Sequence, residues 1–554
     1  MTLRPEDDLN TLPPSQDPEP DQGQRPPPTR FWDVLRNLGP GLIIAGSIVG
    51  SGELIATTKT GAQAGIALLW LVIIGCVIKV FVQIELGRYT ISRGESTLAA
   101  MDSVPGPRFV VNWLVWYWLL MMLASMGQLG GIVGGVGQSL AIAFPITGDY
   151  VEAIRSPSTS ELKRYVLWDD DAKNGGAKLA ALPADQQKRI QEGHRIVGAA
   201  LADLGPRGPE LLQRIRDGES ITDPTTRDDQ IYATLIAIVT AFMLYWGRYD
   251  LIQNFSTVLV VAFTFITLGN VIALQTTENW SIPAADIWYG LSFHLPSRES
   301  GVDPIVTALA TFGIIGVGAT ELIAYPYWCL EKGYARYTGQ NDGTAAWLVR
   351  AKGWIRVMHI DAFASLVIYT VATLAFFLMG VAVLYNEGRD PDGMRMVSTL
   401  STAYVPIFGE YARWLFLGGA FAVLYSTFLV ASAGHSRTVL DALKLCGVVD
   451  RHREDVHRKM LDAISFAFPL LCLGLLFAVG ENPVTLILWS GIMQALMLPM
   501  LAGAALYFRY TKTDPRLRGA WWWDALLLLS SLGMLLAGGW VLYTKLGDLL
   551  ARLS

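Results

Sequence analysis

Long apolar runs constrain the fold of this chain more than any other feature. Eleven such runs occur, at about 39–61, 66–87, 109–145, 231–247, 251–274, 305–328, 360–385, 412–433, 462–480, 484–507 and 523–544. A helix of about 20 apolar residues crosses the hydrocarbon core of a bilayer. Lipid offers no hydrogen bonds to the backbone, so helices satisfy their own peptide groups there. The sequence therefore predicts an all-α polytopic membrane protein with about 11 transmembrane helices.

Basic residues in the short loops predict how these helices are oriented. The loops after the second, sixth, eighth and tenth runs are rich in Arg and Lys, whereas Glu481–Pro483 has none and 275–304 has only Arg298. Cytoplasmic loops carry an excess of basic residues. We therefore expect a multi-pass protein of the cell (inner) membrane, with a cytoplasmic N-terminus and an outer C-terminus. The 43 basic and 48 acidic residues form no basic domain, so no nucleic-acid partner is expected beside the lipid bilayer.

The chain divides into four regions. Residues 1–30 are rich in Pro, Asp, Glu and Gln, a composition typical of a disordered tail, here a cytoplasmic one. Residues 31–146 hold the first three runs, and 229–554 hold the fourth to the eleventh. Between them, 147–228 is a polar insertion that falls on the outer side, and its apolar residues recur at helix-like spacing. The simplest expectation is a small, solvated helical cap without a role in transport.

One eight-residue pattern occurs twice, at Val49–Ala56 and at Val317–Ala324. Both copies read Val-Gly-x-x-Glu-Leu-Ile-Ala, and they place Glu53 and Glu321 inside the first and sixth runs. A charge at that depth costs at least ~2.5 kcal/mol. A unit of five helices that is repeated once would make these two runs equivalent and opposite in orientation. Transporters built from such inverted repeats break the two helices at the midplane and bind substrate there.

Glycines near both glutamates suit broken helices, and two carboxylates with freed backbone carbonyls suit a hard divalent cation. We predict Glu53 and Glu321 as metal ligands. Gly50, Ser51 and Thr320 fall in the two broken stretches and are predicted to contact the substrate. Two alternatives remain open at this point. The glutamates can carry H⁺ or Na⁺ beside a small organic solute, or they can act as hydrogen-bonding groups between two glycine-rich packing surfaces.

Other polar groups inside the apolar runs have weaker signals. Gln494 in the tenth run is predicted either to line the substrate cavity or to form an interhelical hydrogen bond. Lys79 either pairs with a carboxylate or extends to the membrane edge, while Asp361 is read as a helix cap and His435 as a satisfied polar contact. The glycines of the third run are read as packing positions. We find no phosphate loop, dinucleotide fingerprint or hydrolase motif, so neither an enzyme nor a cofactor is expected.

Several of these segments resemble the Nramp family of divalent-metal transporters. Gly39–Gly41, Ala62–Gly65 and Leu68–Trp70 are similar to that family's first two spans, and Gln83–Gly87 is similar to the end of its second. Gly318–Thr320 resembles the start of its sixth-span signature, Gly-Ala-Thr-x-Met-Pro-His. The resemblance implies a leucine-transporter-type fold, in which two inverted five-helix repeats contain broken helices 1 and 6. It also implies transport of a divalent metal ion.

The same comparison indicates a divergent branch of that family. The family's Asp-Pro-Gly-Asn signature falls on Gly50–Glu53, and its sixth-span methionine falls on Leu322. Backbone carbonyls that contact the metal in the family fall at Ser47 and Ala319. The acidic residues that move protons in the family's third span have no counterpart here. The resemblance thus implies a rebuilt metal site that favours Mg²⁺ or Mn²⁺ as the substrate; a non-transporting sensor that uses the insertion as a binding module is a further alternative.

Overall fold

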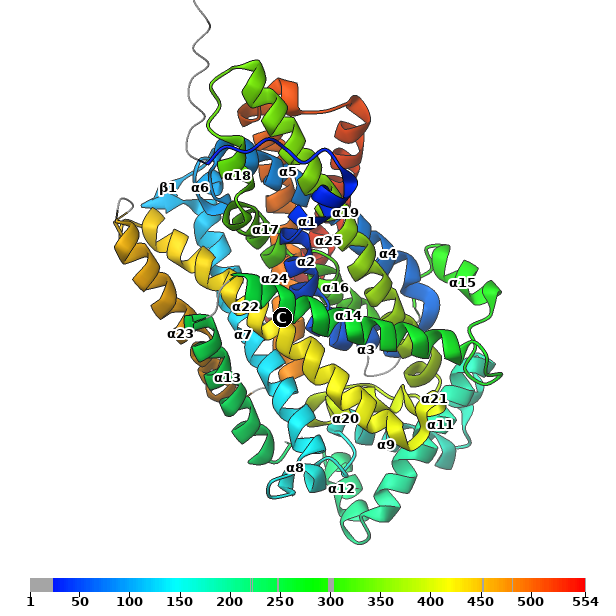
Figure 1. Cartoon of the computed structure of the whole chain (residues 1–554). Helices are drawn as coiled ribbons and strands as arrows, with labels where there is room; N and C mark the ends of the chain where they lie inside the picture. The colour runs from blue at the N-terminus through cyan, green and yellow to red at the C-terminus, as the bar shows by residue number, and fades with distance from the viewer. Residues whose placement is uncertain are drawn as a thin grey trace, which may run out of the picture.

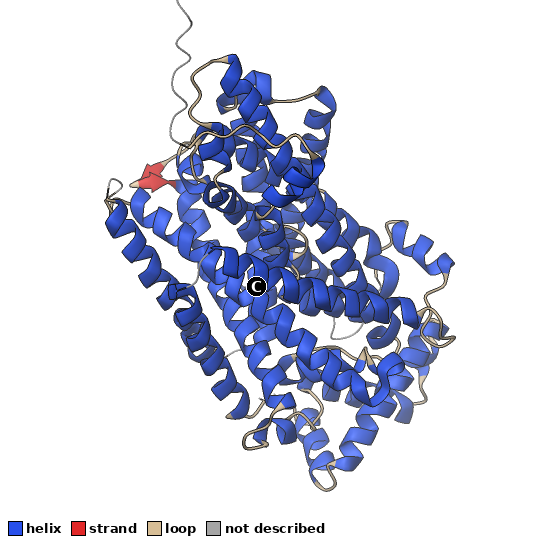
Figure 2. Ribbon diagram, viewed as in Figure 1, coloured by secondary structure: helices blue, strands red, loops and turns tan. Residues whose placement is uncertain are grey.

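The computed structural model describes residues 23–219, 221, 223–246, 249–296, 303–450, 453–480 and 482–553. These residues are almost entirely helical (Figure 2). Their two short strands, β1 (Arg108–Phe109) and β2 (Val111–Asn112), pair antiparallel with each other. Twenty-two residues of the predicted tail, 1–22, lie outside the described residues. Residues 23–30 form no regular element, and the Arg25 carbonyl accepts a hydrogen bond from the Trp354 indole at 3.0 Å.

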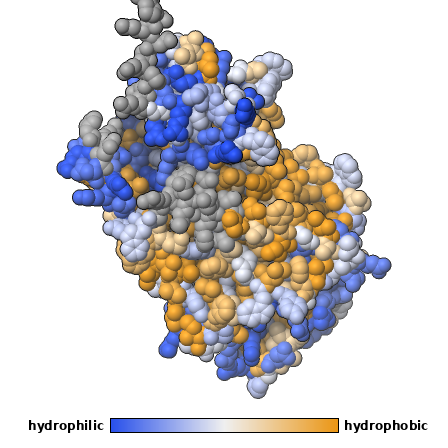
Figure 3. Space-filling view, viewed as in Figure 1, coloured by the Kyte–Doolittle hydropathy of each residue, from blue (hydrophilic) through white to orange (hydrophobic). Residues whose placement is uncertain are grey.

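Nine helices in the described part of the chain are long and apolar enough to cross a membrane. The longest, Pro40–Arg93, has 54 residues and would measure about 80 Å if it were straight, more than twice the ~30 Å hydrocarbon core. Gly65 turns the chain at φ +58°, so this stretch makes two passes. With the partly described helix Tyr249–Leu274, every predicted run corresponds to a helix. The face of the molecule in Figure 3 has a broad hydrophobic band between hydrophilic ends.

The first repeat contains spans 1 to 5. Its helices are α2 (Pro40–Ile48), η1 (Ser51–Thr57) and α3 (Thr58–Ala64) in span 1, α4 (Leu69–Val77) and α5 (Lys79–Arg93) in span 2, α7 (Trp113–Ala143), α13 (Asp228–Trp246) and α14 (Tyr249–Leu274). The second repeat and the last span contain α16 (Pro304–Ile314) and α17 (Ala319–Lys332) in span 6, α19 (Ala345–Met379) with η3 (Gly380–Tyr385), α22 (Ala412–Leu445), α23 (Glu454–Val479), α24 (Pro483–Tyr507) with η6 (Phe508–Lys512), and α25 (Trp521–Leu553).

Short helices connect these spans. They are α1 (Phe31–Asn37), η2 (Gly65–Leu68), α6 (Thr97–Asp102), α15 (Ala284–Leu291), α18 (Tyr334–Thr338), η4 (Gly393–Arg395), α20 (Met396–Thr402), α21 (Val405–Phe408), η5 (Gly409–Tyr411) and η7 (Pro515–Leu517). The insertion contains α8 (Asp149–Ala153), α9 (Thr159–Lys173), α10 (Ala177–Ala180), α11 (Ala184–Asp203) and α12 (Arg207–Arg216).

Spans 1 and 6 are both broken, and they run in opposite directions. The first half of span 1, α2, packs against the second half of span 6, α17, whereas η1 and α3 pack against α16. Figure 1 shows α2, α16 and α17 close to the centre of the molecule. The inverted repeat with broken helices 1 and 6 is therefore confirmed.

The insertion docks on the loop that follows span 7. The Tyr150 hydroxyl donates a hydrogen bond to the Met394 carbonyl, and Arg395 forms an ion pair with Asp223 at 2.7 Å. The Arg189 guanidinium lies 4.3 Å from the centre of the Tyr385 ring. The cap is thus attached to the end of a membrane span and is not merely a solvated appendage.

Glycines permit the closest helix contacts in the bundle. A Cβ atom added to Gly130 or Gly131 of α7 would lie 2.8 Å from the Cys472 carbonyl oxygen or 2.6 Å from the Pro483 carbonyl oxygen, respectively. These distances are shorter than real Cβ contacts, so the two backbones approach only because no side chain intervenes. The interpretation of the third-run glycines as packing positions agrees with these contacts.

A matched pair of glycines in α24 tests this packing. A Cβ atom at Gly491 would lie 2.3 Å from the Ala310 carbonyl oxygen of α16, whereas a Cβ atom at Gly503 would have no neighbour within 4 Å. We expect Gly491→Ala to destabilise the protein by about 1–3 kcal/mol through overpacking. Gly503→Ala should be neutral or stabilising by up to ~1 kcal/mol. Thermal unfolding in detergent measures both, and equal midpoints for the two variants would contradict the close α16–α24 contact.

Candidate functional site

The break in span 1 lies between α2 and η1. Helix α2 ends at Ile48, and η1 begins at Ser51. A Cβ atom at the intervening Gly50 would lie 1.7 Å from the Thr427 hydroxyl of α22. Glycine therefore allows α22 to approach the break directly. The backbone N–H of Gly50 points to the carboxylate of Glu53 at 3.5 Å.

The break in span 6 lies between α16 and α17. Helix α16 ends at Ile314, and α17 begins at Ala319, which is fully buried. Gly316 between them has φ +57°, a left-handed conformation that glycine adopts without strain. Because the chain is not helical here, backbone groups near the middle of the membrane are free to bond side chains and ions.

Glu53 ties the two breaks together. Its side chain is completely buried. One carboxylate oxygen accepts hydrogen bonds from the Gly316 N–H at 3.3 Å and from the Thr373 hydroxyl of α19 at 3.2 Å. The other oxygen faces the Gly50 N–H. Glu53 thus joins spans 1, 6 and 7. Thr373 was not predicted from the sequence, because it is one of many threonines in apolar runs.

Glu321 lies on the other side of the span 6 break, in the first turn of α17. Its carboxylate accepts hydrogen bonds from the Ser47 hydroxyl at 3.3 Å and from the Thr320 hydroxyl at 2.7 Å. It is only partly buried and borders a cavity of about 10 Å³, roughly the space that one water molecule occupies. This cavity lies between α2, α17 and α22, and His435 also lines it. His435 is therefore part of the Glu321 cavity, beyond the structural role expected from the sequence.

A cluster of amides and hydroxyls completes the site. The Gln494 side-chain oxygen lies 3.3 Å from the Thr320 N–H and 3.1 Å from the Thr320 hydroxyl. The Gln494 amide donates to the side-chain oxygen of Gln128 in α7 at 2.8 Å, and Gln128 in turn donates to the Ser51 hydroxyl at 3.1 Å. Gln494 thus forms interhelical hydrogen bonds next to the breaks. Gln128 was missed, although an amide in an apolar run was a usable signal.

Lys79 adds a positive charge to the site. It is completely buried, and its ammonium donates hydrogen bonds to the Phe312 carbonyl and to the Ile315 carbonyl, the latter at 2.7 Å. These carbonyls belong to the C-terminal end of α16, where the helix dipole is negative. Lys79 therefore does not extend to the membrane edge, and it forms no ion pair with a carboxylate among the described residues. Its two predicted arrangements were both wrong, because the partners are backbone groups exposed by the break.

Asp361 caps a helix, but not its own. It lies within the long helix α19, and its carboxylate accepts hydrogen bonds from the N–H groups of Gly39 and Gly41 and from the Tyr325 hydroxyl at 3.1 Å. Gly39 and Gly41 lie at the start of α2. Asp361 thus satisfies the free N–H groups at the beginning of span 1 and fixes it to spans 6 and 7.

The predicted site residues therefore lie around the two breaks, but Glu321 and Glu53 have different hydrogen-bond partners. Ser47, Thr320 and Glu321 are in contact, while Glu53 has different hydrogen-bond partners in the described part of the chain. The described residues contain no group of three or more His, Cys, Asp and Glu side chains that could hold a metal ion. Any ion bound here would depend on hydroxyl, amide and backbone oxygens beside a carboxylate.

Comparison with known proteins supports the fold. No family profile and no curated protein matches the sequence. Among solved structures, the chain is similar to a mutant of the Eremococcus coleocola manganese transporter, with 15% identity and a TM-score of 0.57 over 93% of this chain and 88% of that one. The same transporter in complex with an aromatic bis-isothiourea substituted compound gives 16% identity, the same coverage and the same TM-score. This chain is thus a polytopic membrane protein with the fold of that transporter.

Proposed function

We propose that this protein is a transporter that moves a divalent metal cation by alternating access, with its site between broken spans 1 and 6. This proposal rests on one observation: Glu321 borders a small cavity at the span 6 break, where Ser47 and Thr320 also lie. A cavity of about 10 Å³ suits an ion better than an organic solute. Oxygen donors suit the hard cations Mg²⁺ and Mn²⁺.

The two glutamates have different roles in this proposal. Glu321 is the metal ligand that the cavity exposes, while Glu53 holds the two breaks in register and approaches the ion only when the helices move. The backbone carbonyls at Ser47 and Ala319 and the side chains of Ser51 and Gln494 are the remaining proposed contacts. The similarity to a manganese transporter supports this reading through the fold. We further propose a location in the cell (inner) membrane with a cytoplasmic N-terminus.

The charge of Lys79 favours one alternative function, the transport of a small organic solute together with H⁺ or Na⁺. Glu53, Glu321 and Lys79 together carry a formal charge of −1, and a single negative charge suits a monovalent coupling ion. Uptake of Mn²⁺ and Mg²⁺ into proteoliposomes decides between these functions. We expect uptake of at least one of these ions above that of protein-free vesicles, and competition between the two ions. If neither ion enters, and neither raises the melting temperature, metal transport is wrong and organic solutes become the candidates.

A further inference from the structure

We propose that the insertion contains a binding site for a small anion, of the size of chloride, acetate or phosphate, between α9 and α11. The site is a cavity of about 40 Å³, which is more than one water molecule needs. The α9 side of the cavity is lined by Glu161, Arg164, Tyr165 and Trp168. The α11 side includes His194, and the loop after span 7 contributes Gly388. This inference does not depend on the proposed transport function.

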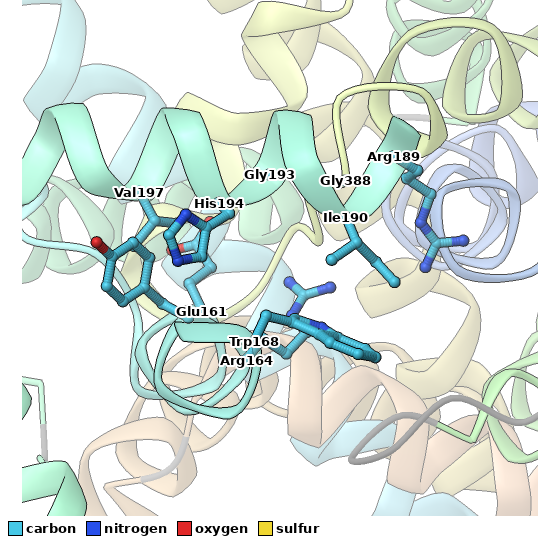
Figure 4. Close-up of a pocket in the computed structure, with 10 residues that line it drawn as sticks. Glu161, Arg164, Trp168, Arg189, Ile190, Gly193, His194, Val197 and Gly388 are labelled. Atoms are coloured by element: carbon cyan, nitrogen blue, oxygen red, sulfur yellow. The ribbon is translucent and has the colours of Figure 1, made fainter. Parts of the chain in front are cut away.

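Two buried nitrogen atoms carry the proposal. Nη2 of Arg164 and Nε2 of His194 are both shielded from solvent, and neither has a hydrogen-bond partner in the part of the chain that the structure describes. Buried polar groups are nearly always hydrogen-bonded. A guanidinium only donates, and a neutral imidazole can place its N–H on Nε2. In Figure 4 the His194 ring descends from α11, and the Arg164 side chain lies beside Trp168 in the gap between the two helices. Both residues line the same cavity, so an anion bound there would offer acceptors to these nitrogen atoms.

The charges that surround the cavity agree with an anionic ligand. Glu161 is the acidic lining residue, and its carboxylate is already used at the start of α9, where it accepts hydrogen bonds from the Ser158 N–H and hydroxyl, each at 2.8 Å. Burial raises the pKa of Asp390 nearby, but Lys59 and Arg164 outweigh it and hold this pKa below its usual value. Arg164 therefore lies close to Asp390, yet its Nη2 atom makes no hydrogen bond to any residue that the structure describes.

The cavity lies where the insertion contacts the loop after span 7, so a bound anion would affect that contact. Gly193 of α11 lies against Gly388, since a Cβ atom at Gly193 would be 3.4 Å from the Gly388 carbonyl oxygen. Two residues further on, Asp390 forms a buried ion pair with Lys59 of α3 at 2.7 Å. The anion would thus hold α9 and α11 together directly above the loop that anchors the second half of span 1.

Anion-dependent stability of the full-length protein in detergent tests the site. The melting temperature is measured in gluconate, which is too bulky for the cavity, while chloride, acetate or phosphate is titrated at constant ionic strength. We expect a saturable increase for the wild type and at least tenfold weaker half-saturation for Arg164→Gln and His194→Gln. Arg195→Gln is the matched control, because it makes the same Arg-to-Gln change in α11, next to His194, at a side chain that is 67% exposed.

The outcomes separate clearly. The site is supported if any of the three anions gives a saturable increase in melting temperature that is lost in Arg164→Gln or His194→Gln and kept in Arg195→Gln. A wild-type midpoint that is independent of the anion overturns the proposal, and so does saturation that is unchanged in both variants. If Arg164→Gln does not fold, His194→Gln decides alone, because the neutral amide replaces a neutral ring. Gel filtration and equal melting temperatures in gluconate establish that the variants are folded.

Discussion

Glu321→Gln should reduce divalent-metal uptake at least ~100-fold while leaving the protein folded. Glu321 is partly exposed to the small cavity at the span 6 break, and its carboxylate is the negative charge nearest to that space. The amide retains the size and one oxygen but loses the charge that attracts a hard cation, and changes even outside the ligand shell of metal sites cost about 10–100-fold in affinity. Initial rates of Mn²⁺ and Mg²⁺ uptake into proteoliposomes measure the effect.

Two variants make this result specific to the site. Glu410→Gln removes the same charge from an exposed glutamate in the η5 connector and should transport like the wild type. Glu53→Gln should instead lower the melting temperature as well as uptake, because an amide cannot accept hydrogen bonds from Gly316, Thr373 and Gly50 in the way a carboxylate does. Losing buried hydrogen bonds of this kind costs roughly 1–3 kcal/mol. Normal metal uptake by Glu321→Gln would contradict the assignment of Glu321 as ligand.

Lys79→Met should be among the most destabilising single substitutions in the membrane region. The methionine has a similar volume but cannot donate to the Phe312 and Ile315 carbonyls, which would remain buried without their partner at the end of α16. Leaving a buried backbone carbonyl without its hydrogen-bond donor costs about 1–3 kcal/mol per group. We expect a melting temperature that is lower by roughly 5 °C or more, together with loss of uptake, because the α16–α17 break would no longer be held open.

Lys352→Met provides the control for this substitution. Lys352 is an exposed lysine in α19, so the same chemical change there should leave the melting temperature within about 0.5 kcal/mol of the wild type, the usual range for surface positions. If Lys79→Met is as stable as Lys352→Met, the capping of α16 by Lys79 is not what holds the break, and the interpretation of its hydrogen bonds is incorrect.

The described helices correspond to runs that are visible in the sequence because transmembrane helices obey local rules. About 20 consecutive apolar residues suffice to specify a span, and glycines with a glutamate in the same eight-residue pattern marked both breaks. The repeat also predicted that spans 1 and 6 run antiparallel, since an odd number of helices reverses the second copy. These inferences needed only composition, spacing and order along the chain.

The tertiary structure alone decided which polar groups meet. Lys79 binds carbonyls 233 and 236 residues away, Asp361 caps a helix that begins more than 300 residues before it, and Glu53 meets Thr373 across 320 residues. An apolar run does not reveal which face of its helix turns toward which neighbour, because nearly every face is apolar. Helix rotation and packing, set here by glycine contacts between distant helices, therefore distinguished the glutamate that holds the breaks together from the glutamate that borders the cavity.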